Sequence, residues 1–328
     1  MQQDIIQNPT PAELEQFYIP FPDGDPAARI GLRLDFFFRR LGEADLREAL
    51  VGCIEQYLAL AGDRMILYSV AGDRRYRKLK PGQRVDPARL RAMINPEGDF
   101  LLQASAAEEG IAQHWAINVM SSQIKFREDE LGYLIAYLPF TALENAPPRS
   151  FTKLFLRFCD ALAVEHAYGG MGWVLPFDPG GRRGALRLPA LGEQAMRFCA
   201  LDVHDPSGTL LHCKQGIKSI NWLTAVSHRL LERVGGAEAV AKAAGPEIVV
   251  HPYSNGAVFQ AGETPQIGDS QQGLIPPAYV ALGRALKPLR AAFNNYPIFT
   301  APPNYPAPAG VDPDIGYTQR WLARFDGD

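Results

Sequence analysis

Apolar residues alternate with other residues in several short stretches of the chain, a pattern typical of β-strands with a buried face. The clearest stretch is 30–38, where Ile30, Leu32, Leu34, Phe36 and Phe38 occupy every second position. Asn255-Gly256 is a strong turn signal and predicts a hairpin between the strands 248–251 and 257–260. The same reasoning predicts further strands at 64–70, 114–119, 132–139 and 210–220.

Other stretches repeat apolar residues every three or four positions, which predicts amphipathic helices. Residues 45–61 form the clearest example, and Gly62 is placed to end this helix in a left-handed conformation. A second helix is predicted over 151–168, with Gly169-Gly170 as its stop. A third helix is predicted over 222–234, and Asn221 is interpreted as its cap. Further helices are predicted over 237–244 and from Pro277 onward.

These elements predict an α+β fold, with a mixed or antiparallel sheet and helices packed on it. We expect an irregular segment over 1–28, a single domain over 29–293 and a proline-rich tail over 294–328. A similar order of strands and helices in 29–170 and 171–293 indicates two related halves. Trp321, Leu322 and Phe325 are expected to anchor the tail to the domain.

Composition narrows the function. The chain has 328 residues, of which 47% are hydrophobic and 21% charged, and a net charge of −3. This balance is typical of a globular protein and gives no electrostatic footprint for nucleic acid. The N-terminus lacks a secretory signal, and no run of about 18 apolar residues predicts a membrane span. Four cysteines without a paired spacing suit a reducing compartment. We therefore expect a cytoplasmic protein that binds neither nucleic acid nor membrane.

The sequence shows little catalytic or metal-binding pattern. Cys199, His204, His212 and Cys213 lie within fifteen residues, but their spacings do not match a zinc site. His166 has no nucleophile at a motif spacing and is interpreted as a residue near a helix C-terminus. We expect no catalytic residue, no metal and no cofactor.

Three charged residues leave an enzymatic alternative open. Glu263 and Asp269 flank a Pro-Gly loop, and Lys218 is placed to pair with one of them. Such a set would suit a hydrolase or nuclease. The favoured interpretation is structural, because a carboxylate in a rigid turn accepts backbone N–H groups. The basic run 74–84 is interpreted in the same way, as a solvated face.

Two motifs carry a family resemblance. One reads Ile217-Lys218-Ser219-Ile220-Asn221-Trp222-Leu223-Thr224, and the other reads Gln260-Ala261-Gly262-Glu263-Thr264-Pro265-Gln266-Ile267-Gly268-Asp269. Together with the segments 166–172 and 277–290, they resemble the type VI secretion immunity family that includes TsiT-like proteins. Ser219 stands where the family pattern has glycine.

The resemblance implies a protein that binds and neutralises a cognate type VI effector toxin encoded beside it. Several such effectors are nucleases. No catalytic residues are carried over from the family, and the motif residues are expected to be structural. They are Lys218, Asn221, Trp222, Gly262, Glu263, Pro265, Gly268 and Asp269.

The densest acidic run is Glu128-Asp129-Glu130, in the predicted turn between two strands. A nuclease must attract phosphate, so its cleft is electropositive. An inhibitor gains association rate from opposite charge. We therefore expect these three residues to contact the toxin, against the alternative that they form a solvated turn.

Overall fold

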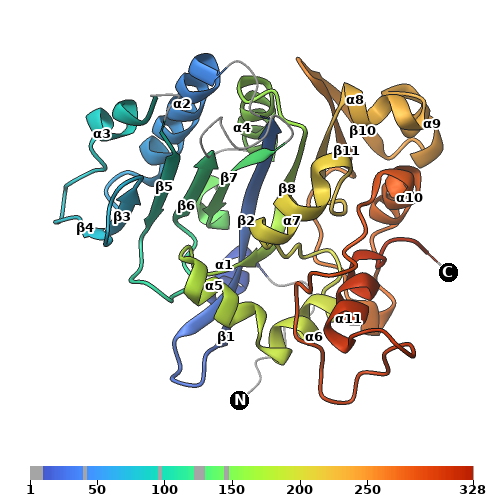
Figure 1. The fold of residues 1–328 in the computed structure, drawn as a ribbon. Coiled ribbons are helices and arrows are strands. Elements are labelled where there is room, and N and C mark those ends of the chain that lie inside the picture. The colour runs from blue at the N-terminus through green and yellow to red at the C-terminus, as the bar shows by residue number, and fades with distance from the viewer. Residues whose placement is uncertain (1–9, 40–42, 95–97, 122–129, 144–147, 328) are drawn as a thin grey trace.

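The computed structural model describes residues 10–39, 43–94, 98–121, 130–143 and 148–327. They form an α+β fold around one sheet of 11 strands, which confirms the predicted fold class. Along the sheet the strand order is β10-β11-β9-β8-β2-β7-β6-β5-β3-β4, and β1 pairs with the start of β2. Every one of these pairings is antiparallel. Figure 1 shows the sheet crossing the whole molecule, with helices on both sides.

The predicted strands are found in the first half of the chain and in the late hairpin. The strands are β1 (Tyr18–Pro20), β2 (Pro26–Arg39), β3 (Leu67–Val70), β4 (Arg77–Lys78), β5 (Phe100–Ser105), β6 (Ala116–Ser121), β7 (Leu131–Leu138), β8 (His166–Val174), β9 (Leu223–Ser227), β10 (Ile248–Tyr253) and β11 (Gly256–Ala261). Residues 10–28 were expected to be irregular, but they contain α1, β1 and the start of β2.

Several helices begin at a proline, whose missing N–H has no partner at that position in any helix. The α-helices are α1 (Pro11–Gln16), α2 (Glu43–Ala61), α3 (Pro87–Arg91), α4 (Pro148–Ala161), α5 (Pro179–Leu186), α6 (Pro189–Arg197), α7 (Pro206–His212), α8 (His228–Leu231), α9 (Ala237–Ala244), α10 (Pro277–Leu286) and α11 (Pro313–Leu322). The helices predicted at 45–61, at 237–244 and from Pro277 are confirmed as α2, α9 and α10.

The central strand β2 separates two different layers. It pairs with β7 on one side and with β8 on the other. Leu34, Phe36 and Phe38 point to the face that α2 and α4 cover, and all three are completely buried. Phe36 packs there against Phe155 and Phe158 of α4, with ring centroids 5.1 and 5.5 Å apart. This face is an ordinary aromatic and aliphatic core.

The opposite face of β2 is partly charged, because Arg33 and Asp35 alternate with the apolar residues. The chain from α5 to α7 and the segment before β9 lie over this face (Figure 1). The sequence pattern indicated one buried face of this strand, whereas the structure buries both.

The helix predicted over 151–168 is wrong in its second half. The α4 helix ends at Ala161, the chain turns through Ala163 with a positive φ of 41°, and β8 begins at His166. The glycines that were interpreted as a helix stop lie inside β8. Gly169 is needed there because a Cβ atom would come within 2.6 Å of the Phe155 ring.

The two elements predicted around Lys218 are also wrong. Residues 210–220 were predicted as a strand, but α7 and a 3₁₀ turn occupy the first part of this segment. Asp205 caps α7 by accepting the N–H of Ser207. The helix predicted over 222–234 is instead the strand β9 followed by the short helix α8. β9 is an inner strand between β8 and β11, so sheet pairing overrides the helical spacing of its apolar residues.

The proline-rich tail is irregular from Tyr296 to Asp312, with turns closed by Tyr305 N–H to the Pro302 carbonyl and Val311 N–H to the Pro308 carbonyl, and it leads into α11. The predicted anchor is confirmed, because Trp321, Leu322 and Phe325 are buried. In Figure 1 this C-terminal segment lies beside α10 and α6. The division of the domain into two related halves remains a proposal.

Candidate functional site

A buried ionic cluster lies on the charged face of β2. It consists of Arg33, Asp35, Asp202, Lys218 and Arg324, which come from four separate segments of the chain. Residues two apart on a strand point to the same face, so β2 supplies the first pair. Arg33 Nη2 lies 2.8 Å from Asp35 Oδ2, and Arg33 Nη1 donates to the carbonyl of Trp173 at 2.6 Å.

Lys218, from the first family motif, has all three of its donors satisfied. Its Nζ donates to the two carboxylate oxygens of Asp202 at 2.8 and 2.7 Å and to the Val203 carbonyl at 2.7 Å. Asp202 is held in turn by its backbone, which bonds to Met171 and Trp173 of β8. The predicted pairing of Lys218 with Glu263 or Asp269 is therefore wrong.

Arg324 reaches the cluster from the C-terminal segment after α11. Its Nη2 lies 3.7 Å from Asp202 Oδ1, and its Nε donates to the Cys199 carbonyl at 2.7 Å. The guanidinium also lies 3.8 Å from the centre of the Trp321 ring. Burial lowers the pKa of Arg324 to about 10, so it stays charged at neutral pH. The cluster thus fastens the chain's end to the middle of the sheet.

The cluster carries one more positive than negative charge. Burial lowers the pKa of Lys218, and the nearby Asp202 opposes that shift. Burial raises the pKa of Asp35, and Arg33 opposes that shift. His204 Nδ1 lies 3.9 Å from Asp35, and burial together with the Lys218 charge holds the pKa of His204 well below its usual value. This imidazole is therefore neutral and leaves the excess charge unchanged.

The remaining residues of the first motif join the sheet to the second motif. The side-chain amide of Asn221 donates to the Met171 carbonyl at 3.3 Å, and its oxygen accepts the Trp222 N–H at 2.7 Å. Trp222 is buried and stacks on Phe151 of α4, with centroids 6.0 Å apart. Its indole N–H donates to the carbonyl of Gly262 at 3.1 Å, inside the second motif.

The second motif forms a turn after β11. Gly262 and Gly268 have positive φ angles of 81° and 64°, a conformation that glycine adopts without strain. Asp269 lies 3.2 Å from Arg197 and accepts the backbone N–H of Gln271 at 3.0 Å. Pro265 is half-buried and Glu263 is exposed. Lys218, Glu263 and Asp269 therefore have different surroundings, and the structure does not assemble them into one site.

The expected acidic contact falls largely outside the structure. Glu128 and Asp129 lie outside the described residues, whereas Glu130 is half-exposed immediately before β7. His166, predicted near a helix end, is buried in β8 beside Phe37, with ring centroids 4.8 Å apart. Within the described ranges no group of three His, Cys, Asp or Glu side chains is arranged to hold a metal ion.

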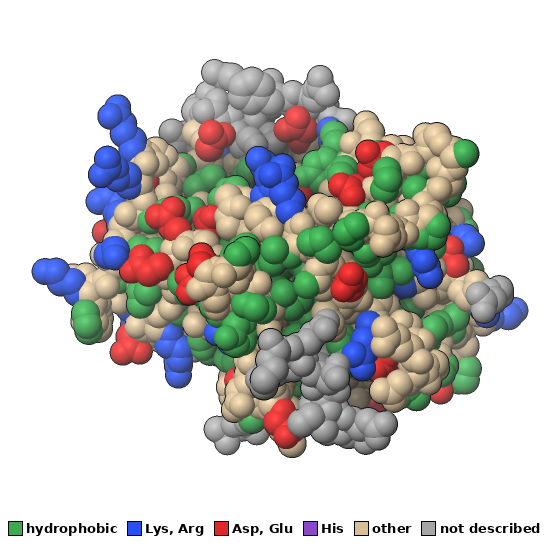
Figure 2. All heavy atoms as spheres, turned by 90° about the horizontal axis from the view of Figure 1, so that it is seen from below, with side chains coloured by type: hydrophobic (Ala, Val, Ile, Leu, Met, Phe, Trp, Pro, Cys, Tyr) green, Lys and Arg blue, Asp and Glu red, His purple; other side chains and the backbone are tan. Residues whose placement is uncertain are grey.

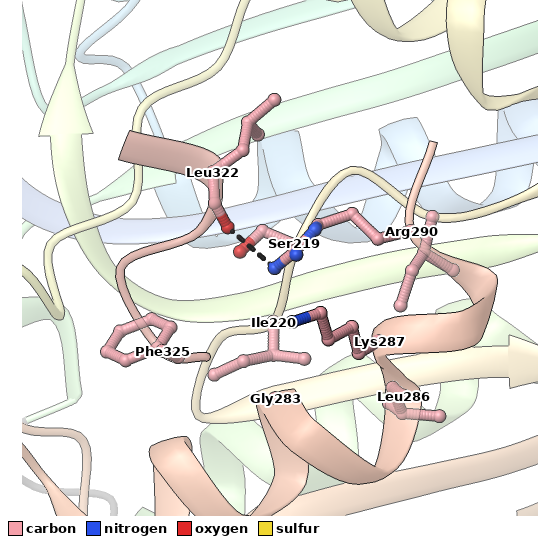
Figure 3. A pocket seen from close by; sticks show the side chains of 9 residues that line it. Ser219, Ile220, Gly283, Leu286, Lys287, Arg290, Leu322 and Phe325 are labelled. Atoms are coloured by element: carbon pink, nitrogen blue, oxygen red, sulfur yellow. Dashed lines mark hydrogen bonds between the residues drawn. The ribbon is translucent and has the colours of Figure 1, made fainter. Parts of the chain in front are cut away.

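A shallow pocket lies next to the cluster, between α10, the C-terminal segment and the first motif. Figure 3 shows Ser219 and Ile220 in the middle, between Leu322 and Phe325 on one side and Leu286, Lys287 and Arg290 on the other. Arg290 donates to the Leu322 carbonyl at 3.1 Å across it. The pocket is therefore bridged by the chain's own contacts.

The sequence identified only Lys218 as a member of the cluster. Arg33 and Asp35 carry a signal that was not used, since two charges inside an otherwise apolar strand must be paired when the strand is buried. Asp202 lies 16 residues before Lys218 in the sequence, and Arg324 lies 106 residues after it. Neither residue belongs to a motif that would have identified it.

The fold and its cluster define an α+β protein with one open antiparallel sheet, and the first motif lies in its core. The model of the TsiV family, type VI immunity for VRR-NUC, matches residues 49–325. The chain belongs to this family, which confirms the resemblance carried by the motifs. A search of curated proteins found no match.

A solved structure from Pseudomonas aeruginosa, a T6SS protein, is similar to this chain with a TM-score of 0.80. It is 21% identical, and the similarity covers 97% of this chain and 89% of that chain. At this level of identity the comparison shows a shared fold. No helix in the part of the chain that the structure describes is long and apolar enough to cross a membrane.

Proposed function

We propose that this protein binds and neutralises a nuclease effector of the type VI secretion system in the cytoplasm of the producing cell. The observation that supports this most strongly is the match of 277 residues, from 49 to 325, to the family of immunity proteins for VRR-NUC effectors. A nuclease acts on nucleic acid inside the cell, so an inhibitor must meet it there. Its partner is expected to be the effector encoded beside it.

We further propose that inhibition depends on binding and not on catalysis. Two of the three residues of the enzymatic alternative support this view. Lys218 is completely buried and bonded to Asp202, and Asp269 is bonded to Arg197. A general acid or base must reach the proton it transfers, and these groups are already occupied by structural partners.

The central experiment is co-purification with the product of the neighbouring gene, carrying an inactivating substitution so that cells survive. We expect a stable complex, since a specific interface buries roughly 1,200–2,000 Å². Cells that express the active effector in the cytoplasm should survive only when this protein is co-expressed there. Failure to bind, or rescue only after export to the periplasm, would refute the proposal.

The acidic run Glu128-Asp129-Glu130 remains the proposed contact with the electropositive cleft of the nuclease. Replacing the three residues with Gln or Asn should slow association, most clearly at low salt, where charges are least screened. Stopped-flow association at two salt concentrations measures this. An unchanged rate and affinity would remove this run from the interface.

A further inference from the structure

The chain has one strongly basic region, which we call the basic loop and which comprises residues 71–91. It contains eight Lys or Arg residues and two Asp residues, a net charge of +6. The whole chain has a net charge of −3, so the remainder carries −9. The basic loop includes β4 and α3 at one end of the sheet. In Figure 2 Lys and Arg side chains gather at the left edge, where these elements lie in Figure 1.

Half of these cations are used to hold the loop itself. Arg77 and Arg89 both pair with Asp73, at 2.9 and 2.8 Å. Hydrogen bonding from Arg77 is the main reason that the pKa of Asp73 is well below its usual value. Lys78 pairs with Glu108, and Arg91 pairs with Glu55.

The other half face solvent. The charged groups of Arg74, Arg75, Lys80 and Arg84 make no ion pair or hydrogen bond with any residue that the structure describes. All four residues are exposed. Arg74 and Arg75 lie in the turn between β3 and the edge strand β4, and both residues are exposed.

The turn that carries them is well anchored. The Tyr76 hydroxyl donates to Gln103 of β5 at 2.6 Å, and its ring contacts Phe177 at a centroid distance of 5.1 Å. Asp73 also accepts the N–H of Val70 at 3.2 Å. A preformed presentation of charge reduces the entropy lost on binding. The turn is therefore suited to contact an anionic group on a partner.

The partner is defined by charge and by the proposed function, on which this inference rests. A metal-dependent nuclease holds its divalent cation with carboxylates at the active site, and the phosphate-attracting cations that the acidic run is proposed to contact surround those carboxylates. Guanidinium groups match carboxylates with two parallel hydrogen bonds. We propose that Arg74 and Arg75 bind the metal-holding carboxylates of the nuclease effector and take the place of its divalent cation.

The same region is less suited to nucleic acid. Tyr76 is the one aromatic residue between Asp73 and Arg84, and its ring is packed on Phe177 instead of being free to stack on a base. The charge of −9 on the rest of the chain also repels a long polyanion. A cluster of carboxylates is a compact target with a charge opposite to that of the turn.

The test compares two variants of equal charge. Arg74→Gln with Arg75→Gln removes the proposed contact, and Lys242→Gln with Arg320→Gln removes two exposed cations from α9 and α11. Each is titrated with an effector inactivated at a residue other than its metal-holding carboxylates, after the melting temperature of the variant is shown to match the wild type. We expect affinity to fall at least about tenfold for the first variant only. Equal affinities for the two variants would overturn the inference and leave the proposed function intact.

Magnesium gives a second readout that general charge loss would not move. Adding Mg²⁺ to about 10 mM should weaken wild-type binding more than NaCl of equal ionic strength, because the cation and the arginines compete for one set of carboxylates. The Arg74→Gln/Arg75→Gln variant should lose this specific dependence. An equal response to the two salts would contradict the inference. The inference would also be contradicted if the isolated wild-type protein bound a 20-base-pair DNA duplex and the Arg74→Gln/Arg75→Gln variant did not. A wild-type protein that binds no effector would refute the proposed function instead.

Discussion

Both faces of β2 are buried, but they are buried in different ways. On one face Leu34, Phe36 and Phe38 pack under α2 and α4 without a polar partner. On the other face Arg33 and Asp35 join the buried ionic cluster, and each charge depends on partners from elsewhere in the chain. Apolar packing is nondirectional and tolerates changes that conserve volume. Buried charges tolerate conservative changes poorly, because a lost partner leaves an unpaired charge.

This difference separates stability from specificity. The apolar face contributes the hydrophobic free energy that any compact core provides. The ionic cluster contributes less net free energy, since desolvation offsets most of the attraction. It does join β2, the segment before α7, the first motif and the C-terminus at one point. We infer that the cluster selects one arrangement of these segments.

The largest expected effect comes from an isosteric change in the cluster. Asp202→Asn keeps the shape of the side chain but leaves Lys218 without its carboxylate. Breaking a buried ion pair costs about 3–5 kcal/mol. Chemical denaturation should show a loss in that range. If the free energy of unfolding fell by less than about 1 kcal/mol, the cluster would have to be hydrated. The charged face of β2 would then not depend on its ion pairs.

A double-mutant cycle sharpens the same point. Lys218→Met removes the partner charge, so the double variant Asp202→Asn/Lys218→Met should be more stable than the sum of the two single losses predicts. Additive losses would mean that the two residues do not interact in solution.

The apolar side should respond to volume instead. Trp222 stacks on Phe151 of α4. The substitution Trp222→Ala should lower the free energy of unfolding by about 3–5 kcal/mol. Trp222→Phe keeps most of the apolar contact and should lose much less. Thermal melting of the two variants and their binding to the effector are measured together. A Trp222→Ala protein of normal stability that fails to bind would place Trp222 in the interface.

The charged face should also make the protein sensitive to acid. Burial lowers the pKa of His166 to about 3, compared with about 6.5 in the unfolded chain. Below pH 6.5 the unfolded state therefore binds a proton that the folded state refuses, so stability falls as the pH falls. The loss from this group is about 2 kcal/mol at pH 5. Denaturation of His166→Gln should show a shallower pH dependence, and an unchanged slope would exclude His166 as the source.

The smallest expected effect is at Glu263, which is exposed on the turn after β11. Glu263→Ala should change stability by less than about 0.5 kcal/mol. Protection against the effector should also be unchanged. The enzymatic alternative would be restored if the wild type hydrolysed nucleic acid, peptidoglycan or lipid and this folded variant did not.

The sequence pattern predicted an element correctly where interactions between residues near each other in the chain determine the backbone conformation. The alternation in β2, the helical stripe of α2 and the Asn255-Gly256 turn each predicted the observed element, because nearby residues set the backbone conformation there. The two motifs were sufficient to identify the family. The same logic failed at β8 and β9. Their glycines and apolar spacing fit a helix locally, but pairing with distant strands fixed them as inner strands.

The sequence by itself determined the fold class, the family and the burial of the main apolar elements. Only the tertiary structure decided which charges meet. Lys218 bonds to Asp202 and not to the carboxylates of the second motif, and Arg324 reaches Asp202 from the C-terminal segment. A strand pattern fixes the face on which a side chain lies, but the partner across the core comes from another segment. That partner depends on how the whole chain packs, because ionic contacts act over a few ångströms in space and carry no periodic signal along the sequence.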